Sequence, residues 1–355
     1  MSSGSFFHIK QTIRERLKRE SLIEDEDINQ VVQQIIDYPF LGGNKGSLKL
    51  QHDEKAVISG TLYGEIKQQL KLEVEKDIHR RREQSELEKN HYKRSSEKEN
   101  EYEHIVPSKI NEIWSIDFVT FVLYGIYFNI CVVYEIYSQA YLAIKVADSA
   151  NSDVAIAAVN RAVEYSRTKP ERYLLSDNGS AFISEDFEEL LENVKMSGQQ
   201  IPPGQPWYNG ALESGNRDLK KTLYTIAFYD ACKDIKISTK SVARDYLLNR
   251  LELYCDTAQQ LINEQIVRPK FKTTPILVLN EKVKESLIKQ NVFIEKRYEQ
   301  RKSRMADLKN VPVSKRKRVE EKVLTSWKKI SSSLSLNELF AFSELLNERY
   351  HSITI

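Results

Sequence analysis

The sequence predicts an α/β fold in which a mixed β-sheet carries helices on its faces, with further helical regions before and after it. Three successive stretches rich in β-branched and aromatic residues favour strands and cover residues 113–124, 126–137 and 141–146. A helix, a short strand and a second helix are predicted next, at residues 150–165, 172–175 and 185–194. Strands first, then alternating helices and strands, indicate a mixed sheet covered by helices.

One apolar stretch within these strands could pass for a membrane span. Residues 118–134 are almost wholly apolar and are broken at Gly125. The stretch is shorter than the roughly 20 residues that a spanning helix needs. It is also rich in residues that favour strands, and it lies between Asp117 and Glu135. We therefore expect two buried strands joined at Gly125, and no membrane partner.

The length and the cysteines bound the class of protein. A chain of 355 residues has room for two or three domains. Its three cysteines, Cys131, Cys232 and Cys255, lie far apart and form no CxxC pair, which predicts a reducing compartment with neither disulfides nor a cysteine zinc site. The first residues lack the apolar segment of a secretory signal. We expect an intracellular protein that is cytoplasmic or associated with the nucleoid.

The formal net charge of +2 conceals a strong asymmetry. Residues 281–329 hold 16 Lys/Arg and 7 Asp/Glu, a net +9, so the rest of the chain carries −7. Residues 112–221 hold 15 acidic and 9 basic side chains, a net −6. An acidic centre with a basic arm suits an enzyme that holds cations centrally and binds nucleic-acid phosphates peripherally. An ordinary solvated helical tail is the alternative.

Residues 1–72 are predicted to form a helical DNA-binding region. Apolar residues recur at helical spacing from Ile28 to Ile36 and stop before Pro39, a glycine-rich turn follows, and Ser59 stands at the N-cap position of another helix. This pattern is typical of a helix-turn-helix, whose last helix contacts DNA. The side chains predicted to reach DNA lie off the apolar stripe of that helix and are Thr61, Lys67 and Gln68. A three-helix module without DNA-binding function would have the same pattern.

The remaining chain divides by composition. Residues 73–103 contain ten acidic and eight basic side chains with almost no apolar periodicity, which predicts a solvated, partly helical linker over 73–107. Residues 108–228 hold the predicted sheet and form the core, and residues 229–275 form a helical extension that packs against it. Residues 276–355 are predicted to be a basic helical region. Its strongest cationic run, a predicted DNA contact, is Lys315, Arg316, Lys317 and Arg318.

Three acidic residues stand in surroundings that single them out. Asp117 interrupts an apolar strand, where an unpaired charge is costly, so it needs a partner or a cation. Asp177 begins an Asp-Asn-Gly turn, and Glu213 lies on a predicted amphipathic helix. Each has a simpler interpretation when taken alone. Asp117 suits a structural salt bridge, Asp177 an ordinary turn, and Glu213 a solvated helix surface.

Taken together, the three acids and their flanking residues resemble the integrase core shared by retroviral integrases and bacterial transposases. Asp177 and Glu213 are 36 positions apart, with Ser-Asp-Asn-Gly around the first and Pro-Trp-Tyr-Asn-Gly before the second. The resemblance covers roughly residues 111–275, and with the N-terminal segment the chain is similar to insertion-sequence transposases that carry a helix-turn-helix. It implies a ribonuclease-H-like fold, with a mixed five-stranded sheet and flanking helices, and an Asp-Asp-Glu triad of Asp117, Asp177 and Glu213.

The same resemblance implies a DNA transposase or integrase that cleaves the ends of an element and joins them to target DNA. In that family two divalent ions, Mg²⁺ or Mn²⁺, promote the phosphodiester chemistry. Asp117 would ligate both ions, Asp177 one and Glu213 the other, since carboxylate oxygens suit such hard cations. The implied partners are transposon ends, target DNA and further copies of the chain that assemble on DNA as a homo-oligomer.

Further DNA contacts are predicted around Glu213. The apolar stripe of the expected helix, residues 212–227, consists of Leu212, Leu219, Leu223 and Ile226. A neighbouring stripe carries Glu213 with three cations that could bind phosphates, Arg217, Lys220 and Lys221. Simple pairing of Glu213 with Arg217 along the helix is the alternative. The preceding loop offers Trp207, Tyr208 and Asn209, and its aromatic rings could stack on an unpaired base.

The chain departs from the family pattern at two positions. Many relatives carry Thr two residues after the first aspartate, where this chain has Val119, and a common histidine of the terminal motif is Lys270 here. Neither change touches the implied metal ligands. Two other functions stay open: a domesticated DNA-binding factor that keeps the fold, and a nuclease of the same fold that hydrolyses DNA without strand transfer. Terminal inverted repeats beside the gene would favour the transposase.

Overall fold

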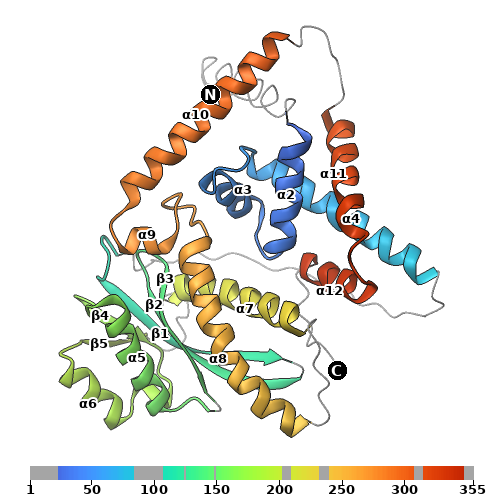
Figure 1. The fold of residues 1–355 in the computed structure, drawn as a ribbon. Helices are drawn as coiled ribbons and strands as arrows, with labels where there is room; N and C mark the ends of the chain where they lie inside the picture. The colour runs from blue at the N-terminus through green and yellow to red at the C-terminus, as the bar shows by residue number, and fades with distance from the viewer. Residues whose placement is uncertain are drawn as a thin grey trace, which may run out of the picture. The chain divides into compact units, whose positions relative to one another are not determined.

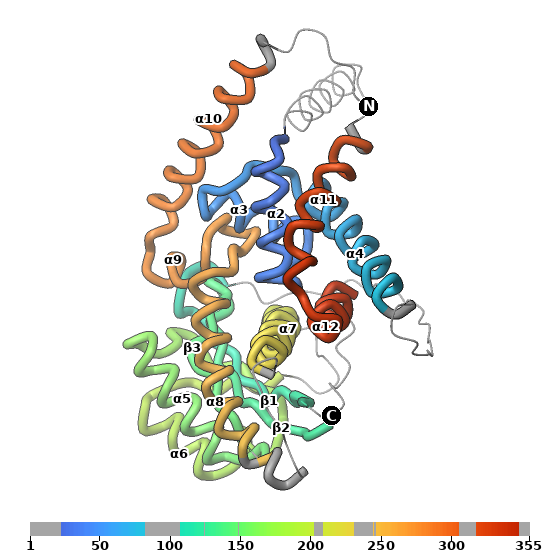
Figure 2. The backbone as a smooth tube through the Cα atoms, turned by 45° about the vertical axis from the view of Figure 1, so that its right-hand side comes forward, coloured from blue at the N-terminus to red at the C-terminus, as the bar shows by residue number. Residues whose placement is uncertain are grey.

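The computed structural model describes residues 23–83, 107–123, 125–147, 149–201, 209–231, 240–307 and 315–347. These residues divide into two compact units (Figures 1 and 2). An α/β unit contains the described residues from 107 to 268 together with 274–282. A helical unit contains the described residues before 84, the short segment 269–273, and those from 283 to 347.

The α/β unit is built around a five-stranded sheet with the strand order β3-β2-β1-β4-β5. β1 pairs antiparallel with β2, and β2 with β3, whereas β1 with β4 and β4 with β5 are parallel pairs. This mixed sheet is that of a ribonuclease-H-like fold, as predicted. The strands are β1 (Ile113–Leu123), β2 (Ile126–Glu135), β3 (Ala140–Ala147), β4 (Tyr173–Ser176) and β5 (Gly198–Gln200).

Two helices, α5 (Ser152–Ser166) and α6 (Glu185–Asn193), cover one face of the sheet (Figure 1). Both begin at a capping side chain, as helices with free N-terminal amides require. The Asn151 side chain accepts from the Val154 amide at 3.1 Å, and Ser184 accepts from the Phe187 amide at 3.4 Å. Buried alanines of α5 pack on β1 to β3 in one core cluster, so small side chains let this helix lie close to the sheet.

The opposite face carries α7 (Gly210–Ala231), which packs on β1, and α8 (Lys240–Gln265), which packs on α7 and on the edge strand β3. The short helix α9 (Pro275–Leu279) follows. Three residues of the predicted apolar stripe, Leu212, Leu219 and Leu223, are fully buried. The ring of Phe121 on β1 lies 4.7 Å from that of Tyr224 on α7. The helix predicted at 212–227 is thus confirmed, and α8 lies within the helical extension predicted at 229–275.

The apolar stretch at 118–134 forms two paired strands, as predicted. Phe121 of β1 lies opposite Phe128 of β2, and Gly125 between the strands has a φ of +72°, a conformation that glycine adopts without steric cost. In the part of the chain that the structure describes, no helix has the length and apolar character to cross a membrane. Cys131 and Cys255 are buried free thiols.

The helical unit joins residues from both ends of the chain around one hydrophobic core. Its helices are α2 (Asp25–Asp37), α3 (Gly43–His52), α4 (Gly60–Glu83), α10 (Val283–Asp307), α11 (Lys315–Ser331) and α12 (Leu336–Leu346). Val323 and Trp327 of α11 and Phe342 of α12 lie in the same buried cluster as Ile28 and Leu62. The N-terminal and C-terminal regions, predicted as separate domains, therefore share one core.

The linker predicted at 73–107 is helical at its start, as expected, since α4 continues to Glu83, but the prediction that this part is solvated is wrong. Val74 and Ile78 are buried in the core of the helical unit, and Arg81 donates to the carbonyl groups of Ser331 at 2.8 Å and Leu334 at 2.6 Å. Two apolar residues one turn apart are enough to bury this stretch, although the surrounding charges hide the periodicity. Residues 84–106 of the predicted linker lie outside the described residues.

The helices predicted before Pro39 and after Ser59 are confirmed as α2 and α4, whereas the glycine-rich turn predicted between them is wrong in part, because Gly43 and Gly46 lie in α3. Ser59 caps α4, since its hydroxyl accepts from the Leu62 amide at 3.1 Å. Gly46 of α3 lies on the ring of Tyr63, where an added Cβ would come within 2.2 Å of a ring carbon, so only glycine lets α3 approach α4 this closely. The role of these helices as a DNA-binding helix-turn-helix stays a prediction.

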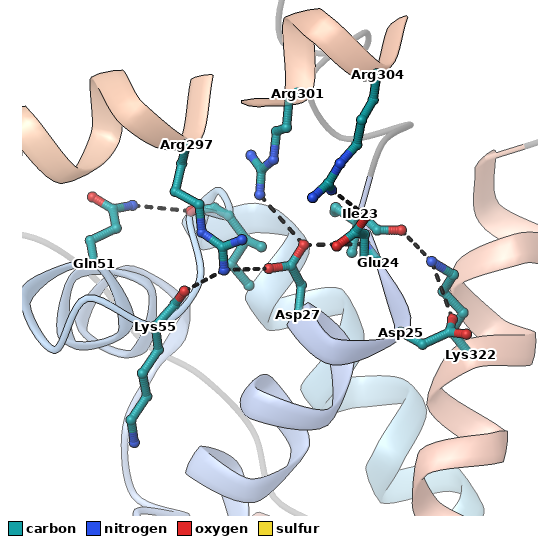
Figure 3. A network of polar contacts seen from close by, with 11 residues as sticks. Ile23, Glu24, Asp25, Asp27, Gln51, Lys55, Arg297, Arg301, Arg304 and Lys322 are labelled. Carbon is teal, nitrogen blue, oxygen red and sulfur yellow. Dashed lines mark hydrogen bonds and ion pairs between the residues drawn. The ribbon is translucent and has the colours of Figure 1, made fainter. Parts of the chain in front are cut away.

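The acidic N-terminus of α2 holds cations from two later helices (Figure 3). Asp27, which is buried, accepts from Arg297 of α10 at 3.1 Å, and its second oxygen lies 3.7 Å from Arg301. Two flanking pairs join Glu24 to Arg304, and Asp25 to Lys322 of α11. Four cations of the predicted basic arm are therefore used inside the helical unit.

Replacement of Asp27 by alanine is expected to lower the free energy of unfolding of the helical unit by about 3 kcal/mol, because it leaves the buried Arg301 and the half-buried Arg297 without their carboxylate. Glu299→Ala is the matched control, since it breaks an exposed pair with Lys302 at 3.8 Å and should change stability by less than about 0.5 kcal/mol. Urea unfolding followed by tryptophan fluorescence measures both. Equal stability of the two variants would contradict the prediction.

Candidate active site

The pairing of β1 with β4 brings Asp177 beside the strand that carries Asp117. β1 and β4 are parallel, and Ser115 lies opposite Leu175. Asp117 follows Ser115 by two residues on β1, and residues two apart on a strand point to the same face. Ser115 marks that face, because its hydroxyl donates to Asn209 at the start of α7 at 2.6 Å. The register thus directs Asp117 toward the side of the sheet that α7 covers, and Asp177 directly follows the end of β4.

Asp117 lies in the middle of β1 and is half-buried. Burial, followed by repulsion from Asp177 and a smaller repulsion from Glu213, raises the pKa of Asp117 to about 6. The Phe118 amide and the Asn216 side chain oppose this rise by hydrogen bonding to the carboxylate, with Asn216 Nδ2 at 3.1 Å from Oδ2. Both of the other predicted acids therefore act electrostatically on Asp117.

α7 brings two functional side chains to this place, Glu213 in its first turn and Asn216 one turn later. Glu213 is exposed, whereas Asn216 is buried. Between them, Gly215 lies against Tyr134 and Tyr141 of the sheet, where an added Cβ would come within 3.0 to 3.2 Å of their side chains. Glycine at this position lets the helix sit low enough on the sheet for Asn216 to reach Asp117.

The loop after β4 holds the second acid by local hydrogen bonds. Asp177 Oδ1 accepts from the Gly179 amide at 2.9 Å, which is a common turn for Asp. Asn178 donates from its side chain to the carbonyl of Ile201 at 2.9 Å and so ties this loop to the residue after β5. The 3₁₀ turn Ser180–Phe182 follows, with Phe182 packed into the core. Asp177 itself is exposed and available to a ligand.

The other residues predicted near Glu213 differ in where their side chains lie. Trp207 and Tyr208 lie outside the described residues. Asn209 is buried and accepts the hydrogen bond of Ser115, so in this structure its side chain supports the junction of β1 and α7. Arg217 is exposed, and Lys220 and Lys221 are half-buried on the same helix as Glu213.

In the helical unit, Thr61 and Gln68 are exposed on α4. Lys67 is half-buried, and its ammonium donates to the carbonyls of Pro39 at 2.7 Å and Leu41 at 3.0 Å. This lysine therefore closes the turn between α2 and α3, a role that its sequence position did not indicate. Lys317 and Arg318 are exposed in the first turn of α11, which begins at Lys315, and the side chains of Lys315 and Arg316 are outside the described set.

The oxygen ligands at the site fit a hard divalent cation, because Asp117 is a half-buried carboxylate whose charge is penalised by two further carboxylates. A cation between them would relieve that repulsion. Within the described ranges, no three His, Cys, Asp or Glu side chains are gathered closely enough to enclose a metal ion by themselves. Mg²⁺ commonly binds through one or two carboxylates, with water and substrate phosphates completing its shell.

Sequence reasoning missed three residues that support the acids. Asn216 hydrogen-bonds Asp117, Gly215 permits the close contact of α7, and Arg268 pairs with Asp218 on α7. The spacing of Asn216 from Glu213, one helical turn, was a usable signal for a side chain on the same side of the helix. No local pattern indicated that Arg268, 50 residues after Asp218, would meet this helix.

The sheet order is that of a ribonuclease-H-like α/β domain, in which Asp177 and Glu213 repel the half-buried Asp117. Residues 107–206 match the family model of the integrase core domain. This segment is therefore similar in sequence to the integrase core domain. It includes Asp117 and Asp177 and ends before Glu213.

Several solved structures are similar at low identity. A chain of the simian T-cell lymphotropic virus intasome in complex with PP2A regulatory subunit B56 gamma is 18% identical, with a TM-score of 0.42 over 50% of this chain and 57% of that chain. This chain thus matches little more than half the length of that relative. The HTLV-2 integrase catalytic core domain in complex with magnesium is 18% identical, with a TM-score of 0.38 over 48% of this chain and 97% of that one. For the BIV integrase catalytic core domain the values are 19%, 0.35, 49% and 98%. No curated protein matches the chain.

Asp117→Asn is expected to stabilise the α/β unit at pH 7.5 by on the order of 2 kcal/mol, because it removes a charge that burial and repulsion disfavour. The folded pKa of about 6 lies above the ordinary 3.8, so the unfolded chain releases this proton first. Wild-type stability should therefore fall as pH rises from about 4 to about 6, and the variant should not share this loss.

Thermal melting of both proteins at pH 4 and pH 7.5 measures this effect. Glu189→Gln, which neutralises an exposed acid on α6, is the control and should show no such dependence. A gain from Asp117→Asn that is equal at the two pH values would mean that repulsion at the site is not its cause.

Proposed function

We propose that this protein is a DNA transposase or integrase that cleaves DNA ends and joins them to target DNA, with Asp117, Asp177 and Glu213 as its metal-binding catalytic acids. The observation that carries the proposal is that an acid of the β4 loop and an acid of α7 repel a third acid on β1 and raise its pKa. Two of them lie in a segment that matches the integrase core domain. Structural ion pairs do not explain this arrangement, because the closest charged neighbours of Asp117 are themselves acidic.

The three carboxylates would hold one or two Mg²⁺ or Mn²⁺ ions. Asp117 would be shared, because both of the other acids repel its charge. When bound, such ions supply activation of the attacking oxygen and stabilisation of the leaving oxygen. The protein's own part is positional: β1 and the Asp177 turn hold two acids, and Asn216 orients the Asp117 carboxylate from α7.

The DNA would be bound beside the acids by Arg217, Lys220 and Lys221, which α7 carries one to two turns after Glu213. In the helical unit, Thr61, Gln68 and the first turn of α11 are further proposed contacts, whereas Lys67 would contribute through the turn that it closes. Transposon ends and target DNA are the proposed substrates, and a homo-oligomer assembled on DNA is the proposed active form.

Asp177→Asn is expected to abolish cleavage and strand transfer while leaving DNA binding intact. Asparagine keeps the size of the side chain and its turn, and it removes the negative charge that a divalent ion needs. Duplexes cut from the DNA that borders the gene would be incubated with wild type and variant in Mg²⁺, Mn²⁺ or EDTA, and products separated on denaturing gels. Glu185→Gln, on the exposed start of α6, serves as the charge-matched control.

Full activity of Asp177→Asn would overturn the metal assignment. End binding by the wild type without cleavage in any divalent metal would favour the domesticated DNA-binding factor instead. Cleavage that never yields joined strands would favour the nuclease.

Replacement of Arg217 and Lys220 together by alanine is expected to weaken DNA binding and to reduce the slope of log affinity against log salt by about 2, because each phosphate contact releases close to one counterion. Fluorescence anisotropy with a labelled duplex at several salt concentrations measures the slope. Lys195→Ala, an exposed lysine between α6 and β5, is the control. An unchanged slope for the double variant would remove these residues from the DNA interface.

A further inference from the structure

We propose that Arg268, beyond the end of α8, is a positioning residue of the active site: its buried ion pair with Asp218 sets the depth and rotation of α7, and thereby the places of Glu213 and Asn216 beside Asp117. The inference rests on the proposed function. It assigns a role to a segment that lies outside the matched integrase core, which ends at residue 206.

The ion pair is short and almost fully enclosed. Arg268 Nη1 lies 2.6 Å from Asp218 Oδ2, and the side chains are 3% and 18% exposed. A second guanidinium nitrogen, Nη2, faces the carbonyl of Gln139 in the β2–β3 turn at 3.4 Å. The planar fork of arginine thus links α7 to the turn between two strands, a geometry that a lysine ammonium reproduces only in part.

Asp218 lies on the same helix as the catalytic groups. It follows Glu213 by five residues and Asn216 by two, so a shift of α7 at Asp218 is transmitted to both through a rigid helix. The hydrogen bond from Asn216 to Asp117 is only 3.1 Å long, and a displacement of about 1 Å would break it. Misplacement of this size at a catalytic site can cost about a hundredfold in rate.

Two tyrosines of the sheet, Tyr134 and Tyr141, limit the same movement of α7 from the opposite side. The rings of Tyr134 and Tyr141 meet edge to face at 4.9 Å, and both contact the place where Gly215 passes. The hydroxyl of Tyr141 also reaches Asn216 Oδ1 at 3.5 Å. Arg268 and the tyrosines therefore hold α7 at two neighbouring points, Gly215 and Asp218.

Side chains of α8 hold the backbone of Tyr141 in place by hydrogen bonds. Asn263 accepts from the Tyr141 amide at 2.9 Å and donates to the Tyr141 carbonyl at 2.8 Å, and Gln259 donates to the same carbonyl at 3.0 Å. These side chains replace the strand partner that the edge strand β3 lacks. Because Arg268 follows α8 closely, the helix that secures Tyr141 also sets where the guanidinium meets Asp218.

The experiment compares three variants of this pair, Arg268→Met, Arg268→Lys and Asp218→Asn, in the full-length protein. The control is Arg161→Met, which breaks an ion pair of 2.5 Å between α5 and α8 that does not involve α7. Nicking of supercoiled plasmid DNA gives kcat and KM and the Mg²⁺ concentration for half-maximal rate. Calorimetry with Mn²⁺ on the DNA-free protein reports metal binding without catalysis, and thermal melting reports folding.

We expect Arg268→Met and Asp218→Asn to lower kcat at least tenfold with an unchanged KM for DNA, to raise the half-maximal Mg²⁺ concentration and to weaken Mn²⁺ binding severalfold. Arg268→Lys should recover part of each loss, and Arg161→Met should match wild type. If Arg268→Met fails to fold, Arg268→Lys and Asp218→Asn carry the comparison through the same measurements.

The inference is overturned if the folded variants keep wild-type kcat, Mg²⁺ dependence and Mn²⁺ affinity, or if their losses only follow the folded fraction. A wild type that never nicks DNA contradicts the proposed function instead. In that case the Mn²⁺ affinities still decide the inference, since a positioning role predicts weaker binding in Asp218→Asn than in Arg161→Met.

Discussion

The repulsion of Asp117 by Asp177 and Glu213 is the constraint on which the candidate site of the α/β unit depends. Asp117 keeps its place in the central strand although burial and two acidic neighbours raise its pKa to about 6. The pairing of β1 with β2 on one side and with β4 on the other provides the rigidity that opposes this repulsion. Such stored electrostatic cost is typical of functional sites, because a cation that binds there converts it into affinity.

In the helical unit, by contrast, a buried acidic side chain is paired with cations. Asp27 is more deeply buried than Asp117, yet two arginines of α10 pair with it. A buried charge that is paired with opposite charges holds chain segments together, whereas a buried charge beside like charges favours the binding of a ligand. The contrast distinguishes a structural acid from a candidate metal ligand more clearly than burial does.

The candidate site is completed by chain segments that follow the matched core. Glu213 and Asn216 lie on α7, which follows residue 206, and α7 in turn is held by Arg268 and by the tyrosines that α8 secures. The core thus supplies one acid on a central strand and one in the turn after β4, and the later helices supply the third candidate acid together with its alignment. A catalytic geometry of this kind needs supporting contacts as much as the acids themselves.

The sequence by itself predicted the strands β1 to β4, the helices α5 to α8 and the three candidate acids, because these predictions depend on local periodicity, turn residues and short motifs. Only the tertiary structure decided which distant segments meet. It gave α2 to α4 a core partner in α11 and α12, extended α4 into the predicted linker, and brought Arg268 to Asp218. It also turned Lys67 and Asn209 inward. A local pattern shows only that a polar side chain lies off an apolar stripe. Whether that side chain then binds water, a buried carbonyl or a buried hydroxyl depends on segments that are remote in the sequence.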